Sequence, residues 1–339
     1  MELIQYKTTE PRPDACAALI DRVYGAYPGY AAALTKEVLY QLAPENPFLA
    51  FGTREGFIAM EGGEPAAHAC AITDSRLPGN VGLIGYFEAA GKEAAGAVLS
   101  AACGHLAARG ITKVYGPVND TTWQRHGVSI AGEAPPFSGE PFTPAAYAGY
   151  FEGSGFAISD RRFSTSIAAN ELPFGGYRGC YDALVKRGFM FTDLEPGALA
   201  PRAREIHAVV NASFTGTPLF VPEGFAEFLY SAGARAAQAD GAVFILAHFG
   251  LKPAGFLLGL PDGCYEGGDF VFKTIGVMPE CRRLGVGSAL FYLMQSRLAG
   301  RGVRKCIFST MRDGNAAIQT LTSRAPVLHR GYLTFSRDI

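Results

Sequence analysis

The sequence has little charge, no clear excess of either sign, and a single tryptophan, Trp123. Charged residues make up 18% of the 339 positions, and the formal net charge is -1. A nearly neutral chain has no overall attraction for a phosphate backbone, so we expect no nucleic-acid partner. Apolar residues make up 48% of the sequence. A chain of this length has room for two domains, each with its own core.

Long apolar segments are also absent. The longest candidate, residues 242–260, is interrupted by His248, Lys252 and Pro253, whereas a membrane-spanning helix needs about 20 apolar residues. The opening residues, MELIQYKTTEPRPD, do not contain the apolar core of a signal peptide. We therefore expect a cytoplasmic protein without a membrane partner.

Paired cysteines are a third absence. The 7 cysteines are scattered, and none belongs to a Cys-x-x-Cys pair. Disulfide frameworks and structural zinc sites use regular or closely spaced cysteines, so we expect reduced thiols. No His/Asp/Glu cluster has ligand spacing either, and we expect no metal.

One stretch, Thr274 to Gly300, carries a chemical pattern. A β-type run at 270–277 is followed by Pro279, a turn of arginines and glycines, and an apolar helix at 288–299. Unpaired N–H groups and the dipole at such a helix start favour an anion. Glycines let the backbone approach a phosphate, and arginines add charge-assisted hydrogen bonds. The pattern also fits an ordinary β–α turn with surface arginines.

The register of this turn resembles the pyrophosphate-binding motif of the GNAT superfamily, the acyl-CoA-dependent N-acyltransferases. The motif here is Val277-x-Pro279 followed by Arg282-x-x-Gly285-x-Gly287. The resemblance implies that the turn holds the pyrophosphate of acetyl-CoA, and that a bulge in the preceding strand pairs with the pantetheine arm. The residues implied in coenzyme binding are Ile275, Val277, Arg282, Arg283, Gly285, Val286, Gly287, Ser288 and Asn315.

An internal repeat extends the resemblance to the first half. Residues 97–115 align without a gap on residues 289–307, both in the order helix, Arg-Gly, strand. Continuing this alignment places 282–287 on 90–95, where both turn glycines are missing and Glu93 would repel a pyrophosphate. We therefore expect an α/β protein with two GNAT-like folds in tandem, each a mixed twisted sheet flanked by helices, of which only the second binds coenzyme.

The expected division is a degenerate GNAT-like domain at 1–168, a linker with a short helix at 169–187, and a coenzyme-binding GNAT domain at 188–339. Glycines and prolines mark the linker. Strands are expected at 48–53, 56–61, 66–74, 82–89, 111–116, 161–167, 189–193, 242–248, 254–260, 270–277, 304–310 and 329–337. Helices are expected at 14–24, from 30, at 92–108, from 143, and at 180–187, 201–213, 223–233, 288–299 and 316–324.

The segment from Asn119 to Pro141 is much longer than an ordinary connection, and such loops are often functional. It carries Trp123 and His126. The tryptophan either anchors the loop or lines the acceptor pocket of the second half.

Other candidate acceptor residues lie in the second half. Phe214 and Phe220 belong to the helix–loop–helix that crosses the acceptor in GNAT folds, although phenylalanine is more often core. Lys273 shares a strand face with Asp269 by alternation and would attract a carboxylate on the substrate.

Acyl transfer to an amine also needs a base and an acid. In several GNAT relatives a glutamate base occupies a position that matches Val271, so Asp269, on the same strand face, is our candidate base. Many members carry a tyrosine acid in the last helix, but the matching positions hold Thr322 or Val327. The remaining candidate acid is Tyr332.

The resemblance implies an N-acetyltransferase that moves an acetyl or short acyl group to a primary amine of a small molecule or peptide. The alternative is a non-catalytic acyl-CoA-binding or sensor protein, which the missing tyrosine favours. An aminoacyl-tRNA-dependent peptidyl transferase would also use paired GNAT folds, but the net charge and intact motif count against it. We expect a monomer or a homodimer.

Overall fold

The computed structural model describes residues 1–9, 13–130, 136–195, 199–236, 240–263, 268–314 and 327–339. These residues form two compact units. The first unit is Met1–Arg162 together with Arg330–Ile339, and the second is Phe163–His329. No helix in the described ranges is long and apolar enough to cross a bilayer.

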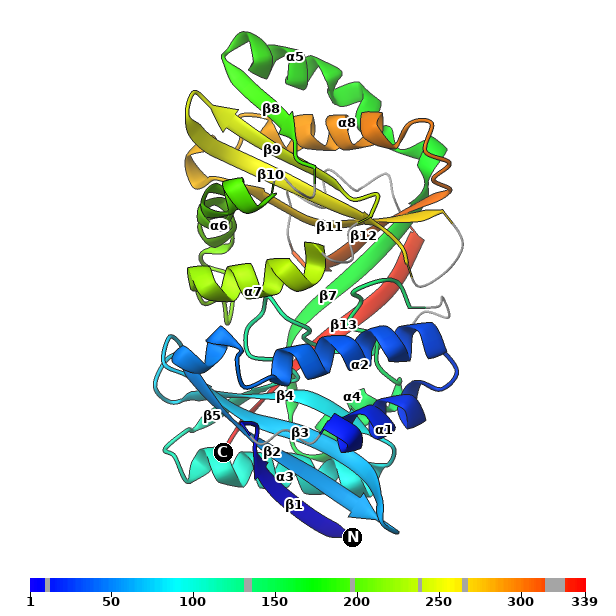
Figure 1. Ribbon diagram of the computed structural model, residues 1–339, viewed down its shortest axis with the longest axis vertical. Helices are drawn as coiled ribbons and strands as arrows, with labels where there is room; N and C mark the ends of the chain where they lie inside the picture. The colour runs from blue at the N-terminus through cyan, green and yellow to red at the C-terminus, as the bar shows by residue number, and fades with distance from the viewer. Residues whose placement is uncertain (10–12, 131–135, 196–198, 237–239, 264–267, 315–326) are drawn as a thin grey trace. The chain divides into compact units, whose positions relative to one another are not determined.

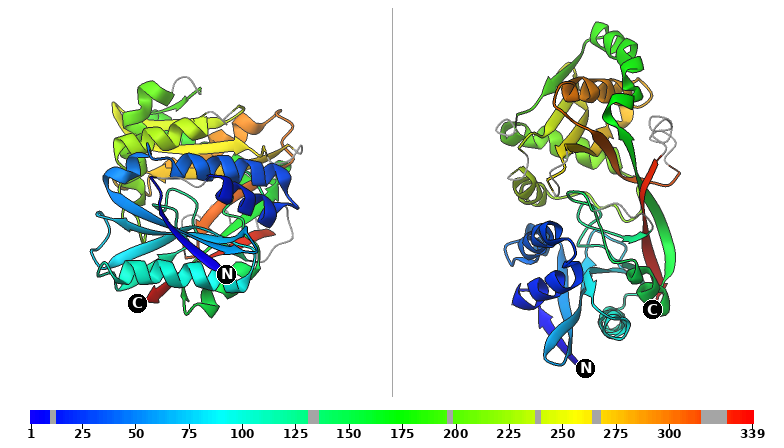
Figure 2. Two further views of the ribbon diagram at one scale, coloured as in Figure 1. Left: turned by 60° about the horizontal axis from the view of Figure 1, so that its bottom comes forward. Right: turned by 90° about the vertical axis from the view of Figure 1, so that its right-hand side faces the viewer.

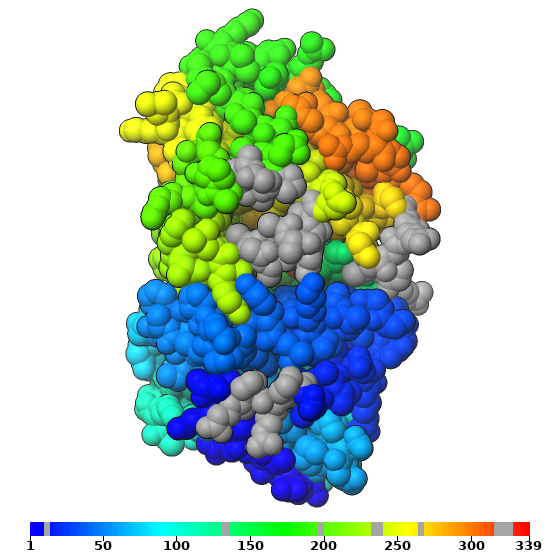
Figure 3. All heavy atoms as spheres, in the orientation of Figure 1, coloured from blue at the N-terminus to red at the C-terminus, as the bar shows by residue number. Residues whose placement is uncertain are grey.

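The first unit is a mixed sheet with helices on both faces (Figures 1 and 2). Helices α1 and α2 lie over one face and form much of the blue surface in Figure 3, while α3 lies over the other face. Its strands are, in sheet order, β1 (Glu2–Lys7), β2 (Gly52–Glu61), β3 (Glu64–Asp74), β4 (Val81–Ala89), β5 (Lys113–Gly116) and the part of β13 (Val327–Asp338) that belongs to this unit, with β6 (Val128–Ile130) also paired to β13. Its helices are α1 (Pro13–Tyr24), η1 (Pro47–Ala50), α2 (Pro28–Leu42), α3 (Lys92–Ala107) and α4 (Ala146–Gly153).

Local sequence explains the main elements of this unit. Gly62 and Gly63, with φ of 61° and 90°, make the tight β2–β3 turn, a conformation that suits glycine. In α3, residues at helical spacing face the sheet with 0% exposure, namely Ala95, Val98, Leu99, Ala102 and Leu106. Because several of these are small, the helix packs close to β2 and β3.

The second unit is also a mixed sheet between two pairs of helices (Figure 1). Helices α5 and α8 lie over one face, and α6 and α7 over the other. The strands, in sheet order, are the 163–168 part of β7 (Ala157–Ala168), β12 (Lys305–Arg312), β11 (Asp269–Val277), β10 (Lys252–Pro261), β9 (Val243–Phe249) and β8 (Phe189–Asp193). The helices are η2 (Ala169–Glu171), η3 (Pro173–Tyr177), α5 (Arg178–Lys186), α6 (Leu199–Phe214), α7 (Phe225–Ala236), η5 (Pro279–Cys281) and α8 (Val286–Leu298).

The predicted mixed α/β architecture is confirmed, but the division of the chain differs from the expected ranges. Residues 330–339 belong to the first unit, because β13 pairs with β5 from Phe335–Gly116 to Asp338–Lys113. Phe335 is 0% exposed and stacks on Phe151 at 5.3 Å in the first core. Residues 163–168, expected in the first domain, belong to the second unit.

Two local expectations also change. Residues 48–50, expected to begin a strand, belong to the 3-10 helix η1, because Pro47 takes the first turn and Asn46 caps it. The expected breaks between 53 and 56 do not occur, since β2 runs continuously. The helix expected at 316–324 lies outside the described residues.

Candidate active site

A β-bulge interrupts β11 at Lys273. Leu258 pairs with Thr274 and Gly259 pairs with Phe272, so Lys273 is the extra residue on β11. Such a bulge leaves a residue outside the ladder and bends the strand. The bulge expected in the strand before the turn is therefore present.

The sheet opens at the same point. Parallel pairing between β11 and β12 runs from Asp269–Lys305 to Phe272–Phe308, and the described residues show no pairing beyond it. Both strands nevertheless continue, to Val277 and to Arg312. Strands that part at a bulge leave backbone groups available to a ligand that lies between them.

A pocket lies at this opening. It is lined mainly by apolar side chains of β10, β11, α8 and β12, with Lys273, Thr274 and Ser309 as its polar members. Lys273 is half-buried there, and its role near the acceptor stays a prediction.

The turn after β11 has the geometry expected of an anion site. Met278 N donates to Ala254 O at 2.9 Å, which closes the strand, and η5 follows. Gly285 caps α8 with φ of 96°, a left-handed conformation that strains any side chain. The first bond of the helix is Ala289 N to Gly285 O at 3.0 Å. The N–H groups of residues 286–288 therefore have no acceptor within the helix, and they are available to a phosphate.

The side chains around the turn fit a large anion. Arg282 and Arg283 are exposed, and Arg282 Nη2 also donates to Ser213 O of α6 at 3.0 Å. A Cβ at Gly287 would meet Ile275 and Val277 only in ordinary van der Waals contact, at 3.9 Å. The predicted coenzyme residues from 275 to 288 thus lie on one continuous strand–turn–helix unit, whereas Asn315 lies outside the described residues.

The other candidates in the second unit are placed differently. Asp269 begins β11 on the paired side of the bulge and forms an ion pair with Lys305 at 2.8 Å. The distance from Asp269 to Lys273 along an extended strand is about 13 Å, so Asp269 is not beside the opening. Phe214 and Phe220 are half-buried at the two ends of the turn after α6, and neither is among the described residues that line the pocket.

Three candidates lie in the first unit. Tyr332 is 0% exposed, and its hydroxyl donates to Glu140 Oε1 at 2.6 Å. We expected Tyr332 to act as an acid because we placed residues 188–339 in the second domain. Tyr332 instead belongs to the first unit, which corrects that expectation. Trp123 is half-buried, and His126 Nδ1 donates to Gln124 O at 3.0 Å. Their role in an acceptor pocket stays a prediction.

The first unit repeats the strands but not the turn. Parallel pairing of β4 with β5 ends at Leu83–Tyr115, and β4 has a bulge at Tyr86, whose φ is 52°. The connection from β4 to α3 consists of residues 90–91 alone, whereas β11 and α8 are joined by residues 278–285. The gapless alignment of 282–287 on 90–95 was therefore wrong, because the phosphate turn is missing altogether.

The chain itself occupies the opening of the first unit. Val118 N donates to Ile84 O at 2.8 Å, and Tyr86 N donates to Asn119 Oδ1 at 2.6 Å. A Cβ at Gly85 would lie 2.4 Å from Val118 O. The residues after β5 thus take the place that the second unit leaves open.

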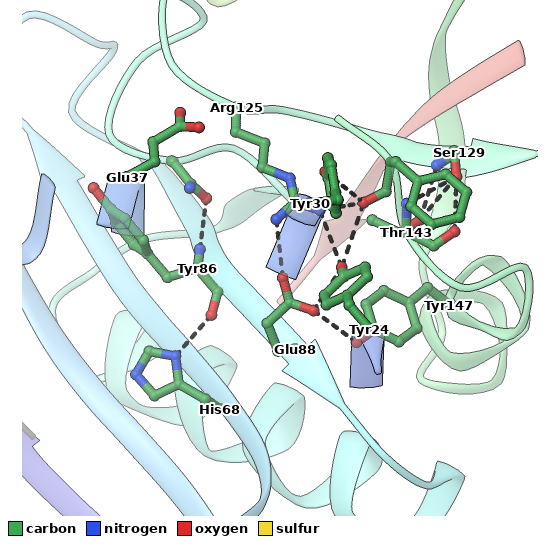
Figure 4. Close-up of polar contacts among 12 residues, drawn as sticks. Tyr24, Tyr30, Glu37, His68, Tyr86, Glu88, Arg125, Ser129, Thr143 and Tyr147 are labelled. Atoms are coloured by element: carbon green, nitrogen blue, oxygen red, sulfur yellow. Dashed lines mark hydrogen bonds and ion pairs between the residues drawn. The ribbon is translucent and has the colours of Figure 1, made fainter. Parts of the chain in front are cut away.

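A buried polar network lies beside this closed opening (Figure 4). Glu88 Oε2 accepts hydrogen bonds from the hydroxyls of Tyr24 and Tyr147, both at 2.8 Å. Arg125 Nη1 lies 3.0 Å from Glu88 Oε1, with side-chain exposures of 11% and 7%. Burial raises the pKa of Glu88, while Arg125 and the two hydroxyls lower it. Sequence reasoning missed this network, although an acid inside the apolar run of β4 was a signal for it.

Nothing in the described residues resembles a metal site, since no group of three or more His, Cys, Asp or Glu side chains is arranged to hold an ion.

A mixed sheet that parts at a bulge, followed by a glycine turn at a helix start, is the arrangement that the resemblance to the GNAT fold predicts. Residues 177–316 match the family model described as Acetyltransferase (GNAT) domain. No curated protein matches the chain. This match assigns residues 177–316 to a GNAT domain, and the chain as a whole has the fold of two GNAT-like units in tandem.

Solved structures support the same fold assignment. A tandem GNAT protein from the clavulanic acid biosynthesis pathway gives a TM-score of 0.61 at 10% identity, covering 99% of this chain and 98% of that one. A probable N-acyltransferase of unknown function from Enterococcus faecalis V583 gives 0.61 at 11% identity, with coverage of 100% and 73%. A GCN5-related N-acetyltransferase from Sphaerobacter thermophilus gives 0.53 at 16% identity, with coverage of 99% and 95%. At these identities the likeness shows the fold alone.

Proposed function

We propose that the second unit transfers an acetyl or other short acyl group from coenzyme A to a primary amine of a small molecule or peptide. The observation that carries the proposal is the continuity of β11, which joins the opened, bulged segment at Lys273 to the Gly285 turn. One strand thus supplies backbone groups for an extended arm and leads to a site for its pyrophosphate.

The chemistry requires an amine that is neutral when it attacks. Its nitrogen lone pair adds to the thioester carbonyl, a C–N bond forms, and the C–S bond breaks with its electron pair going to sulfur. The turn residues bind and orient the donor, and this positioning supplies much of the rate increase. Lys273, half-buried at the opening, favours an acceptor that carries a carboxylate.

The general base is not supplied by a side chain at the opening among the sequence candidates. Asp269 is the sequence candidate, but its ion pair with Lys305 at the paired end of β11 occupies its carboxylate. A water molecule that relays the proton is therefore the simpler arrangement for this site.

A second candidate function is non-catalytic binding of acyl-CoA. It is favoured by the sequence, which has Thr322 and Val327 where relatives carry a tyrosine acid. The two candidates share the coenzyme site and differ in turnover.

Calorimetric titration of the full chain with acetyl-CoA tests for the coenzyme site, which both candidate functions require. Release of free thiol across a panel of amines tests for turnover, which only the transferase shows. Binding with turnover on one amine class supports the transferase. Binding without turnover across amino acids, polyamines, aminoglycosides and peptides favours the binding protein. No binding by the wild-type protein, measured beside Gly285→Asp as a blank, contradicts both.

A further inference from the structure

The pocket at the opening of the second unit contains a hydroxyl without a partner. Ser309 follows Phe308, the last residue of β12 that pairs with β11. Its side chain lines the pocket, its residue is 9% exposed, and its Oγ has no hydrogen-bond partner among the described residues. A buried hydroxyl of this kind destabilises the folded state unless a ligand or water supplies its partner.

The backbone beside Ser309 is also unusual. Thr310 has φ of 42°, which is rare for a β-branched residue and marks local strain. Its N–H is held by Ser164 Oγ of β7 at 3.1 Å. The strand is therefore fixed in a strained conformation directly after the residue whose hydroxyl lacks a partner, as is common at functional sites.

From this geometry we propose that Ser309 is a positioning and charge-stabilising residue that donates a hydrogen bond to the sulfur of the coenzyme. The inference rests on the proposed function. An arm that starts at the Gly285 turn and follows β11 reaches the pocket after about 13 Å of strand, from Val277 to Lys273. Its thioester end then lies at the opening, where Ser309 is a polar group in a mainly apolar lining.

The hydroxyl acts when the C–S bond breaks. The amine forms the C–N bond, the C–S electron pair stays on sulfur, and a thiolate develops in the pocket. Ser309 Oγ–H stabilises this thiolate as a donor, and the proton that finally reaches sulfur comes from the attacking amine through water.

The first unit provides a contrast. The parallel registers place β12 Lys305 and β5 Lys113 in equivalent positions, so Ser309 corresponds to Pro117. Proline has no side-chain donor, and Val118 and Asn119 close the opening there. The hydroxyl is thus found in the unit that keeps the opening and the turn.

The test compares Ser309→Ala with Thr165→Val in the full chain. Thr165 on β7 is a matched control, because it is 9% exposed and its Oγ1 also lacks a partner among the described residues, yet it does not line the pocket. Each protein is titrated calorimetrically with coenzyme A and with desulfo-coenzyme A, which has no sulfur. We expect Ser309→Ala to weaken binding of coenzyme A about threefold to tenfold and to leave desulfo-coenzyme A unchanged.

Turnover and melting complete the test. With an amine that the wild type accepts, Ser309→Ala should lower kcat about 10- to 100-fold, because a bond to a developing anion is stronger than one to a neutral group. Its melting temperature should be equal or higher, since an unpaired hydroxyl is removed. Equal effects on both coenzymes, or none on either, would overturn the role of Ser309 while leaving the proposed function intact. Failure of the wild type to bind coenzyme A would overturn both.

Discussion

The side-chain oxygen of Asn119 lies 2.6 Å from the backbone nitrogen of Tyr86 and accepts its hydrogen bond. This N–H sits at the bulge of β4, the first unit's counterpart of the bulge at Lys273. In the first unit the Asn119 side chain accepts the hydrogen bond of this N–H, whereas in the second unit the bulge residue Lys273 lines a pocket. The same backbone feature is therefore bonded within the first unit, whereas in the second unit it lies beside a pocket.

Asn119→Ala should destabilise the first unit by about 1–3 kcal/mol, because it leaves the buried N–H of Tyr86 without an acceptor. Denaturant unfolding measures the loss. The control is Asn80→Ala, which removes an exposed bond to Thr112 Oγ1 at 3.2 Å and should cost little. Equal costs for the two variants would contradict a special role for Asn119. Affinity for acetyl-CoA should not change in either.

Gly285→Asp should weaken acetyl-CoA binding by at least about 100-fold, since a carboxylate at the helix start repels the pyrophosphate and the φ of 96° strains any side chain. Arg282→Glu should act in the same direction through charge alone. Calorimetry measures both.

Gly302→Asp is the control that distinguishes backbone strain from repulsion of the pyrophosphate in the Gly285→Asp variant. Gly302 has φ of 70° and open space around it, so aspartate there introduces comparable strain away from the turn. It should lower the melting temperature and leave acetyl-CoA affinity unchanged. Loss of affinity in this variant would show that Gly285→Asp acts by general destabilisation.

Lys273→Met should raise KM for amine acceptors that carry a carboxylate by about tenfold, because a half-buried ammonium pairs with such a group. Steady-state kinetics with matched acidic and neutral amines measure the effect. The dissociation constant of acetyl-CoA should be nearly unchanged. Equal losses for both amine types would contradict this prediction.

The stability of the first unit should fall as the pH rises from the ordinary glutamate value of 4.5 toward neutrality. Burial raises the pKa of Glu88, so the folded state binds the proton more tightly than the unfolded state. Its contribution is complete below the unfolded pKa and is lost as the pH passes the folded pKa. Burial also raises the pKa of Glu140 and Asp120, which act in the same direction.

The double variant Glu88→Gln with Arg125→Met tests this sign. It replaces the buried pair together, which avoids leaving Arg125 charged and unpaired. Its melting temperature should vary less steeply with pH than that of the wild type. Parallel profiles would mean that Glu88 does not titrate differently on folding.

Much of the coenzyme site could be predicted from the sequence because its signals are local. The strand, the proline, the glycines and the helix start follow one another within 270–299, and each has a conformational preference of its own. Gly285 illustrates this, since its left-handed φ is a property that glycine alone adopts freely. The repeat likewise indicated two similar folds, because matching helices and strands carry matching apolar patterns.

Other features depended on contacts between residues far apart in the chain. Apolar alternation in β13 predicts a buried strand, but it does not say that the strand completes the first unit. The environment of Glu88 is set by its contacts with Tyr24, Arg125 and Tyr147. That of Ser309 is set by a pocket that several separate strands line. Sequence periodicity reports that a side chain is buried, whereas its partner is decided by tertiary packing, and for the polar groups of this protein the partner determines the chemistry.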